Sequence, residues 1–194
     1  MKTCSALLYL SFDGVLHPAS VWHRSQGGPR LDDTFSGHAL FEHADELDRL
    51  LSHYPHCGIV LSTRWVHAYG FEAAVRHLPA PLQRRVLGFV NLASLHGPTP
   101  ARLAGACRGS AVALDAVARG VRHWVALDES YHQWSTGMGN QVLRTHPTLG
   151  LATPGVWPAL ENWLMRHAGA SADTEASPSF STKPQEVALR LQLQ

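Results

Sequence analysis

Several protein classes are excluded by what this chain of 194 residues has little of. No apolar run approaches the roughly 18 residues that a membrane-spanning helix needs, and the first residues contain no hydrophobic signal region. We therefore expect no membrane span and a cytoplasmic location. The three cysteines form no Cys-x-x-Cys pair, and Cys4 and Cys57 lie in apolar runs. Buried, reduced thiols are expected rather than a disulfide or a zinc site.

Charge is also scarce. Charged residues make up 16% of the chain, below the roughly 25% that is usual for soluble domains. Sixteen Lys and Arg against 15 Asp and Glu leave a net charge of +1, which gives no general reason to expect nucleic-acid binding. The 13 histidines are scattered, without His-x-x-x-His or His-Glu-x-x-His spacing, so they do not predict a metal centre.

What the chain does contain is a series of apolar runs that stop at polar residues. The run that begins at Leu7 stops at Ser11 and Asp13, and Gly14 then permits a tight exit. A buried parallel strand ends in this way where it opens into a polar site, and open α/β sheets bind ligands at those ends. If the strand persists through Asp13, Ser11 and Asp13 share one face about 6.6 Å apart, at about 3.3 Å per residue.

Strand and helix patterns alternate along the rest of the chain, which predicts an α/β fold. The further expected strands are 57–61, 87–90, 123–127 and 141–145. The expected helices, recognised by apolar residues at helical spacing, are 36–53, 66–77, 101–120 in one or two pieces, and 158–167. Within 101–120 the apolar stripe consists of Ala111, Val112, Leu114 and Val117.

Two of these strands also end at polar residues. The strand 57–61 runs into Ser62-Thr63-Arg64, and the strand 123–127 runs into Asp128-Glu129. Ser62 or Thr63 either binds an anion or caps the following helix, and both roles can coexist because a helix N-terminus is itself an anion site. The paired acids are ligands that a small hard cation such as Mg²⁺ prefers.

The segment around Ser11 resembles the first motif of the haloacid dehalogenase (HAD) superfamily, Asp-x-Asp-Gly after an apolar strand. In that family the first Asp attacks phosphorus to form an aspartyl phosphate, and the second acts as general acid and base. The resemblance gives Asp13 the second role, but Ser11 stands where the nucleophile belongs. Ser62 resembles the second motif, which binds the transferring phosphoryl group; Thr63 is the alternative, and Arg64 beside it is a substrate-binding candidate.

The resemblance also implies a cation for the third motif and acids for the fourth. Arg108 is the better-placed cation to neutralise nucleophile and phosphate, Arg102 is the alternative, and a solvated arginine is the other interpretation. Asp128 and Glu129, together with Asp13, are the implied Mg²⁺ ligands. The implied fold is a HAD-like Rossmannoid three-layer sandwich, with a mostly parallel sheet of about five strands in the order 3-2-1-4-5 and a minimal cap.

Two segments are nearest to the compact HAD domains associated with RNA-repair proteins. They are Asp-Gly-Val-Leu-His-Pro at 13–18 and Trp-Val-Ala-Leu-Asp-Glu at 124–129. That association implies a nucleic-acid end or a phosphorylated small molecule as the partner. His17, at the end of the first segment, either contacts substrate or closes the turn.

We expect one HAD-like domain over 1–168, in which the Gly- and Pro-rich segment 19–35 forms at most a small lid loop. Residues 169–194 are expected to be a flexible tail, because their Ala, Ser, Thr, Gly and Pro cannot bury enough surface to fold. Four alternating apolar residues near its end could add a strand to a sheet edge or dock a protein partner: Val187, Leu189, Leu191 and Leu193.

Ser11 decides the functional prediction. A carboxylate is ionised at neutral pH, whereas a serine hydroxyl is protonated and needs a base before it can attack. Losing a carboxylate also weakens Mg²⁺ binding, although a hydroxyl can still ligate the ion. The sequence therefore predicts either a HAD-type phosphatase whose hydrolysis is impaired or altered, or a catalytically inactive HAD fold that binds a phosphorylated ligand, a nucleic-acid end or a protein partner. A serine hydrolase is disfavoured because the chain lacks Gly-x-Ser-x-Gly.

Overall fold

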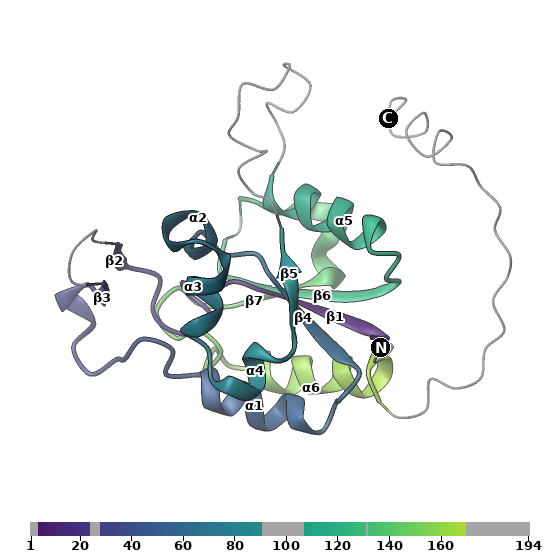
Figure 1. The fold of residues 1–194 in the computed structure, drawn as a ribbon, viewed down its shortest axis with the longest axis horizontal. Coiled ribbons are helices and arrows are strands. Elements are labelled where there is room, and N and C mark those ends of the chain that lie inside the picture. The colour runs from purple at the N-terminus through teal and green to yellow at the C-terminus, as the bar shows by residue number, and fades with distance from the viewer. Residues whose placement is uncertain (1–3, 24–27, 91–106, 131, 170–194) are drawn as a thin grey trace, which may run out of the picture.

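A five-stranded parallel sheet forms the centre of the computed structural model, which describes residues 4–23, 28–90, 107–130 and 132–169 (Figure 1). The strands are β1 (Ala6–Leu10), β4 (Cys57–Leu61), β5 (Val86–Phe89), β6 (His123–Asp128) and β7 (Val142–Arg144). They lie in the order β5-β4-β1-β6-β7, and every neighbouring pair is parallel. Counted along the chain within this sheet, the order is 3-2-1-4-5, so the predicted α/β architecture is confirmed.

The central strands form because their apolar runs are covered on both faces, as a parallel sheet requires. Every residue of β1 and β4 is buried. Alternate residues of β1 point to opposite faces of the sheet. Leu8 and Leu10 belong to one hydrophobic cluster, and Leu7 and Tyr9 belong to the other.

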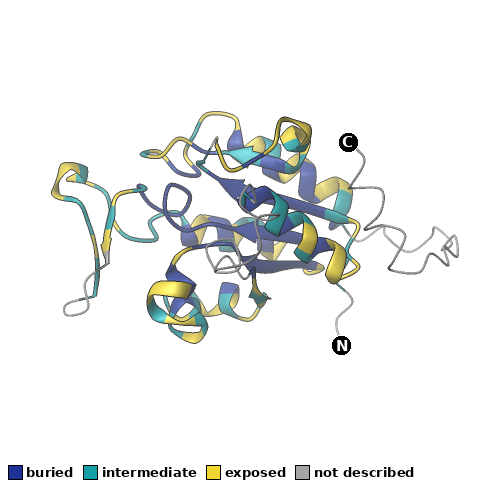
Figure 2. Ribbon diagram, turned by 90° about the horizontal axis from the view of Figure 1, so that it is seen from above, coloured by how far each residue is buried: buried dark blue, intermediate teal, exposed yellow. Residues whose placement is uncertain are grey.

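Helices on the two faces complete a three-layer sandwich. The helices α1 (Ala44–Ser52) and α6 (Val156–His167) pack on the face of Leu8, and α5 (Arg108–Ala118) packs on the face of Tyr9. In Figure 1, α5 lies above the sheet and α1 and α6 lie below it. Figure 2 shows the buried strands between helices whose outer surfaces are exposed. Three short helices connect β4 to β5: α2 (Trp65–Tyr69), α3 (Phe71–Arg76) and α4 (Ala80–Gln83).

Two predicted helices are shorter than expected. The helix predicted over 36–53 begins only at Ala44, because Phe41 has a φ of 60°, which a right-handed helix does not admit. The helix predicted over 66–77 is divided into α2 and α3 by Gly70, whose φ is 86°. Apolar spacing continues through both breaks, so periodicity alone could not locate them.

The apolar stripe predicted for 101–120 is wrong in part. Leu114 and Val117 are exposed, at 60% and 71%, whereas Val112 and Ala116, one turn apart, are buried against the sheet. The helix begins at Arg108; residues 101–106 lie outside the described residues. So do residues 91–100 and the tail beyond Gly169.

The segment 19–35 contains more structure than the predicted loop. Its strands β2 (Val21–His23) and β3 (Pro29–Leu31) pair antiparallel, and η1 (Asp33–Phe35) follows them. Figures 1 and 2 show this hairpin projecting from the domain, on the side toward which β1 runs. Farther along the chain, η4 (Thr136–Gln141) leads into β7.

Within the described ranges, no helix is both long enough and apolar enough to cross a membrane. The cysteines are all free thiols: Cys4, Cys57 and Cys107. Burial raises the pKa of the Cys57 thiol to about 12, which makes it unreactive at neutral pH.

Candidate functional site

The first candidate residues lie where β1 ends. Ser11 still donates its N–H to the carbonyl of Leu127, at 3.3 Å, but the chain turns at Phe12, whose carbonyl accepts from the N–H of Leu16 at 2.8 Å. The strand therefore does not persist through Asp13, and the spacing expected for an extended Ser11-Phe12-Asp13 does not apply.

Gly14 makes this turn possible. Its φ is 68°, and a Cβ at this position would lie 2.6 Å from the Cγ of Glu129. Glycine is therefore required both for the backbone conformation and for the close approach of the Glu129 side chain. This contact brings the loop after β1 against the residue that follows β6.

Asp13 is buried and hydrogen-bonded on one side. Its Oδ1 accepts from the indole Nε1 of Trp65 at 2.8 Å and lies 3.2 Å from the Nε2 of His17. Its Oδ2 lies 3.8 Å from the guanidinium of Arg64, whose side chain is 70% exposed. Burial raises the pKa of Asp13, but the hydrogen bonds from His17 and Trp65 outweigh burial and hold the pKa below its usual value. Asp13 is therefore an ionised carboxylate at neutral pH.

His17 does not occupy a position from which it could contact substrate. Its side chain is fully buried, with an exposure of 0%, and both ring nitrogens have partners inside the domain, Asp13 and the backbone N–H of Phe41. The prediction that His17 binds substrate is corrected accordingly: the imidazole lies behind Asp13 and contacts the carboxylate instead.

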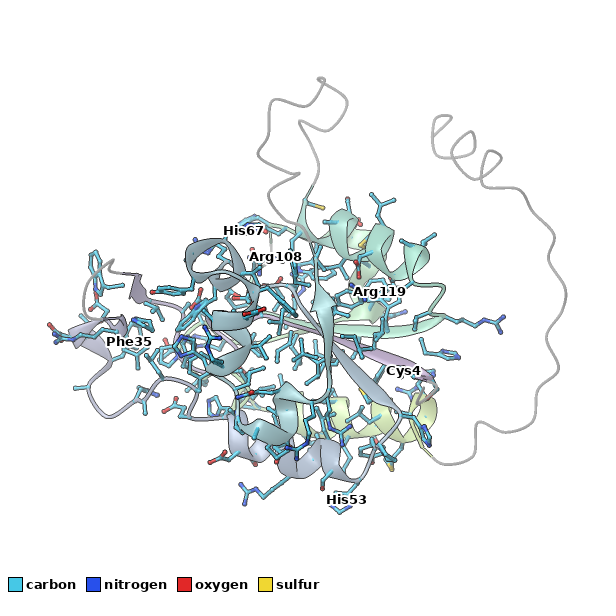
Figure 3. The ribbon with its side chains drawn as sticks, viewed as in Figure 1. Cys4, Phe35, His53, His67, Arg108 and Arg119 are labelled. Carbon is cyan, nitrogen blue, oxygen red and sulfur yellow. The ribbon has the colours of Figure 1, made fainter. Side chains whose placement is uncertain are left out.

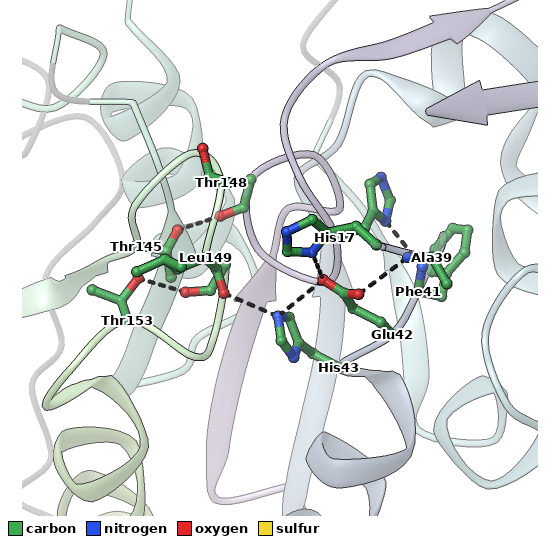
Figure 4. A network of polar contacts seen from close by, with 12 residues as sticks. His17, Ala39, Phe41, Glu42, His43, Thr145, Thr148, Leu149 and Thr153 are labelled. Carbon is green, nitrogen blue, oxygen red and sulfur yellow. Dashed lines mark hydrogen bonds and ion pairs between the residues drawn. The ribbon is translucent and has the colours of Figure 1, made fainter. Parts of the chain in front are cut away.

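The loop that carries Asp13 is fastened to the segment between β7 and α6. Thr145 Oγ1 donates to the carbonyl of Gly14 at 2.6 Å, the N–H of Leu151 donates to Val15 at 2.9 Å, and the N–H of Ala19 donates to Pro147 at 2.7 Å. Figure 4 shows a further link in which His43 lies between Glu42 and the carbonyl of Leu149. These contacts keep the loop in one conformation.

The two hydroxyl residues that follow β4 differ in their hydrogen-bond partners. The N–H of Ser62 donates to the carbonyl of Leu10 at 2.9 Å, which places Ser62 directly beside the end of β1. The Oγ of Ser62 is buried and has no hydrogen-bond partner among the described residues. The Oγ1 of Thr63 accepts from the N–H of Trp65 at 3.3 Å, in the turn that leads into α2, whose N-cap residue is Arg64 and which has no side-chain cap. Ser62 is therefore the hydroxyl left over for a ligand.

Arg108, the first residue of α5, lies inside the molecule between α5 and α2 (Figure 3). Its side chain is 7% exposed. Its Nη1 donates to the Oδ2 of Asp128 at 3.0 Å and to the Oγ of Ser11 at 3.4 Å. The structure thus brings Arg108 to the predicted nucleophile position, and the solvated alternative is wrong. Arg102 lies outside the described residues.

Asp128, at the end of β6, is completely buried. Its Oδ1 accepts from the N–H of Ser130 at 3.0 Å, and its Oδ2 accepts from Arg108 and from the indole Nε1 of Trp134, each at 3.0 Å. Glu129 beside it has a side-chain hydrogen bond with Asp128, and its Oε2 is buried without a partner among the described residues. Burial and the charge of Asp128 raise the pKa of Glu129 to about 7.

Three buried side-chain atoms have no hydrogen-bond partner among the residues that the structure describes: Ser62 Oγ, Arg108 Nε and Glu129 Oε2. Buried polar atoms are almost always paired, so each exception calls for an explanation. All three belong to residues predicted for this site. Two can donate hydrogen bonds and one is a carboxylate oxygen.

One protein-family model matches residues 7–156, which is most of the chain, and its description is HAD domain in Swiss Army Knife RNA repair proteins. The chain belongs to this family. Searches of curated proteins and of solved structures gave no significant match. The matched range of the HAD domain includes every predicted site residue.

The three acids predicted to bind Mg²⁺ are not gathered into one cluster. No group of three or more His, Cys, Asp and Glu in the described part of this HAD domain is arranged to hold a metal ion. Asp13 is engaged by Trp65 and His17 instead. Asp128 and Glu129 remain as a pair. Mg²⁺ often takes only one or two carboxylates and completes its shell with water and phosphate oxygens. Glu129, with an unpartnered Oε2, fits this ion, whereas Asp128 could contribute only a lone pair that Arg108, Trp134 and Ser130 do not use.

Two residues that shape the site were missed by sequence reasoning. Trp65 and Trp134 each donate an indole N–H to one of the buried acids. Trp65 directly follows the polar run Ser62-Thr63-Arg64, but a tryptophan at such a position is equally typical of a hydrophobic core. Trp134 is six residues beyond Asp128, and no spacing rule connects the two.

Proposed function

We propose that this HAD domain binds a phosphate monoester at the carboxyl ends of β1, β4 and β6, and that Ser11 impairs its hydrolysis. The observation that carries the proposal is the set of three unpartnered buried atoms. Ser62 Oγ and Arg108 Nε are donors that suit phosphate oxygens, and Glu129 Oε2 is an acceptor that suits a cation.

The impairment follows from the surroundings of Ser11. Its hydroxyl accepts a hydrogen bond from Arg108, a cation that cannot take up a proton. Among the described residues no hydrogen bond joins the carboxylate of Asp13 to Ser11, because Asp13 accepts from Trp65 and His17 on its Oδ1 instead. A serine without a base at hand is a weak nucleophile. The domain is therefore expected to bind the phosphate ester but to hydrolyse it slowly.

We propose Asp128 and Glu129 as the residues that hold Mg²⁺. Burial and the neighbouring charge of Asp128 raise the pKa of Glu129, and Arg108 compensates its negative charge only in part. Bound Mg²⁺ would neutralise this charge and polarise a phosphoryl oxygen. Arg108 then orients the phosphate from the opposite side while it keeps Asp128 in place.

The natural ligand that we propose is a phosphorylated RNA end, because the matched family is described from RNA repair proteins. A short RNA with a terminal phosphate is expected to bind more tightly than the same RNA after dephosphorylation. Equal affinity would remove the phosphate from the recognition.

The test is Mg²⁺-dependent hydrolysis of an aryl phosphate by the natural protein, Ser11→Asp and Ser11→Asn. Asp restores the carboxylate beside Arg108, and Asn has the same shape without the charge. We expect Ser11→Asp to exceed both other proteins by at least about 100-fold. An inactive Ser11→Asp would contradict the phosphate site, and equal rates for the natural protein and Ser11→Asp would contradict the impairment.

Ser62→Ala separates ligand binding from stability. Removing an unpartnered buried hydroxyl leaves the free energy of unfolding unchanged or raises it, because the desolvation penalty disappears. The same change should weaken the binding of inorganic phosphate about fivefold to tenfold, which corresponds to about 1 kcal/mol for one hydrogen bond. Calorimetric titration measures the affinity and urea unfolding the stability. A loss of stability with unchanged affinity would make Ser62 structural.

A further inference from the structure

Phe41 has an unusual backbone conformation. Among the residues that the structure describes it is the one non-glycine residue with a positive φ, at 60°. This conformation is an outlier for a bulky aromatic residue and costs about 1–3 kcal/mol. Strain of this kind persists only where surrounding contacts impose it.

The strained backbone directs the Phe41 N–H at His17. The N–H donates to Nδ1 of the imidazole at 3.3 Å. A ring nitrogen that accepts a hydrogen bond carries no proton, so the ring proton of His17 lies on Nε2. That nitrogen is 3.2 Å from Oδ1 of Asp13 and therefore donates to the carboxylate.

The Phe41 ring also braces the second donor to Asp13. It packs edge-on against Trp65, with centroids 5.1 Å apart and an interplanar angle of 78°, and against His17 at 4.9 Å and 68°. Its other face stacks on His77 at 5.5 Å and 4°. One residue thus contacts both groups that hold Asp13.

We infer that His17 is a positioning residue and that Phe41 holds it in its Nε2–H tautomer. His17 and Trp65 together fix Asp13 so that Oδ1 accepts hydrogen bonds within the domain and Oδ2 faces the ligand. We call this pair of donors the Asp13 clamp. The orientation is supported by Arg64, whose exposed guanidinium is near Oδ2. The inference deepens the proposed function and rests on it for the role of Asp13, but the tautomer and the orientation can be measured without any ligand.

The first experiment is ¹⁵N NMR of the histidine side chains in the full chain, with His17 assigned by its absence in His17→Gln. A protonated Nε2 and an unprotonated Nδ1 are expected. A proton on Nδ1, or a mixture of tautomers, overturns the inference. This readout uses the natural protein, so it does not depend on whether a variant folds.

The second experiment compares His17→Gln, which keeps an N–H donor near the Nε2 position, with His17→Phe, which keeps a ring and loses the donor. We expect the Trp65 indole N–H to exchange with solvent faster in His17→Phe, because Asp13 loses one of its restraints, and to remain close to the natural rate in His17→Gln. Equal exchange rates of the Trp65 indole N–H in both variants would overturn the inference that His17 restrains Asp13.

The functional consequence is measured on Ser11→Asp. There His17→Phe is expected to lower kcat by about 100-fold through misplacement of Asp13, with little change in KM, and His17→Gln should recover most of the loss. Equal kcat values for both variants and their parent would overturn the positioning role. Inactivity of Ser11→Asp itself would instead contradict the proposed function. The NMR results test the His17 tautomer and its restraint on Asp13 independently of that outcome.

Discussion

The two acids at the centre of the site are held in different ways. Asp13 accepts hydrogen bonds from the indole of Trp65 and from the imidazole of His17, four residues along the chain. Asp128 accepts from the indole of Trp134 and from the guanidinium of Arg108, 20 residues before it. An indole N–H is common to both sides. The difference is that the cation near Asp13 is the exposed Arg64, at 3.8 Å, whereas the cation that holds Asp128 is the buried Arg108, at 3.0 Å.

This difference indicates on which side of the site stability depends on charge: the side of Asp13, after β1, or the side of Asp128, at the end of β6. Removing the cation from a fully buried carboxylate lowers the free energy of unfolding much more than removing one uncharged donor from a carboxylate that keeps another. The half around β6 also contains a second acid, Glu129, whose Oε2 has no hydrogen-bond partner in the described part of the chain. We therefore expect substitutions around Asp128 to have the larger effects and to depend on each other's charge.

The largest effect is expected for Arg108→Met. It leaves Asp128 as a buried carboxylate without its cation, which should lower the free energy of unfolding by about 3–5 kcal/mol. Urea unfolding measures the loss. Arg108→Lys keeps the charge and should lose less, and adding Asp128→Asn to Arg108→Met should recover much of the stability. If the double variant is no more stable than Arg108→Met, the ion pair is not the cause.

Replacing each indole compares the two halves directly. Trp65→Phe should cost about 3 kcal/mol, because it removes a hydrogen bond to a carboxylate and opens a cavity among packed rings. Trp134→Phe should cost about 2 kcal/mol, since Asp128 keeps Arg108 and the N–H of Ser130. Thermal and urea unfolding give both values. The reverse order would show that Asp128 depends on its indole more than Asp13 does, despite the other donors to Asp128.

The sequence predicted what local patterns encode. Apolar runs located the strands, and β4 was predicted with its observed bounds. A strand that is buried on both faces of a parallel sheet is a continuous apolar run, so its ends can be located in the sequence. The polar residues at strand ends were found for the same reason. Their placement around one site required the strand order, which came from the family resemblance.

Contacts between residues that are far apart in the sequence could not be predicted from local patterns. The conformation of Phe41 opposes its own local preference and is imposed by His77, Trp65 and the loop after β1. Its apolar spacing therefore predicted a helix where the chain turns. His17 was predicted just past Asp13 and contacts it, but its burial against Phe41 could not be inferred from the motif.

The smallest expected effect, and the one with opposite sign, is that of Glu129→Gln. The folded protein holds the pKa of Glu129 near 7, above the value of about 4.5 expected for the unfolded chain. Between these values the folded state keeps a proton that the unfolded state releases, so stability falls as pH rises, and the whole cost is present above pH 7. Without Mg²⁺, Glu129→Gln should raise the Tm at pH 8 by about 3 °C, or about 1 kcal/mol, and by almost nothing near pH 4.5. Added Mg²⁺ should shrink the difference at pH 8, because the ion compensates the same charge in the natural protein. A gain of equal size at both pH values would show that Glu129 is not an uncompensated acid, and the contrast with Asp128 would then rest on Arg108 alone.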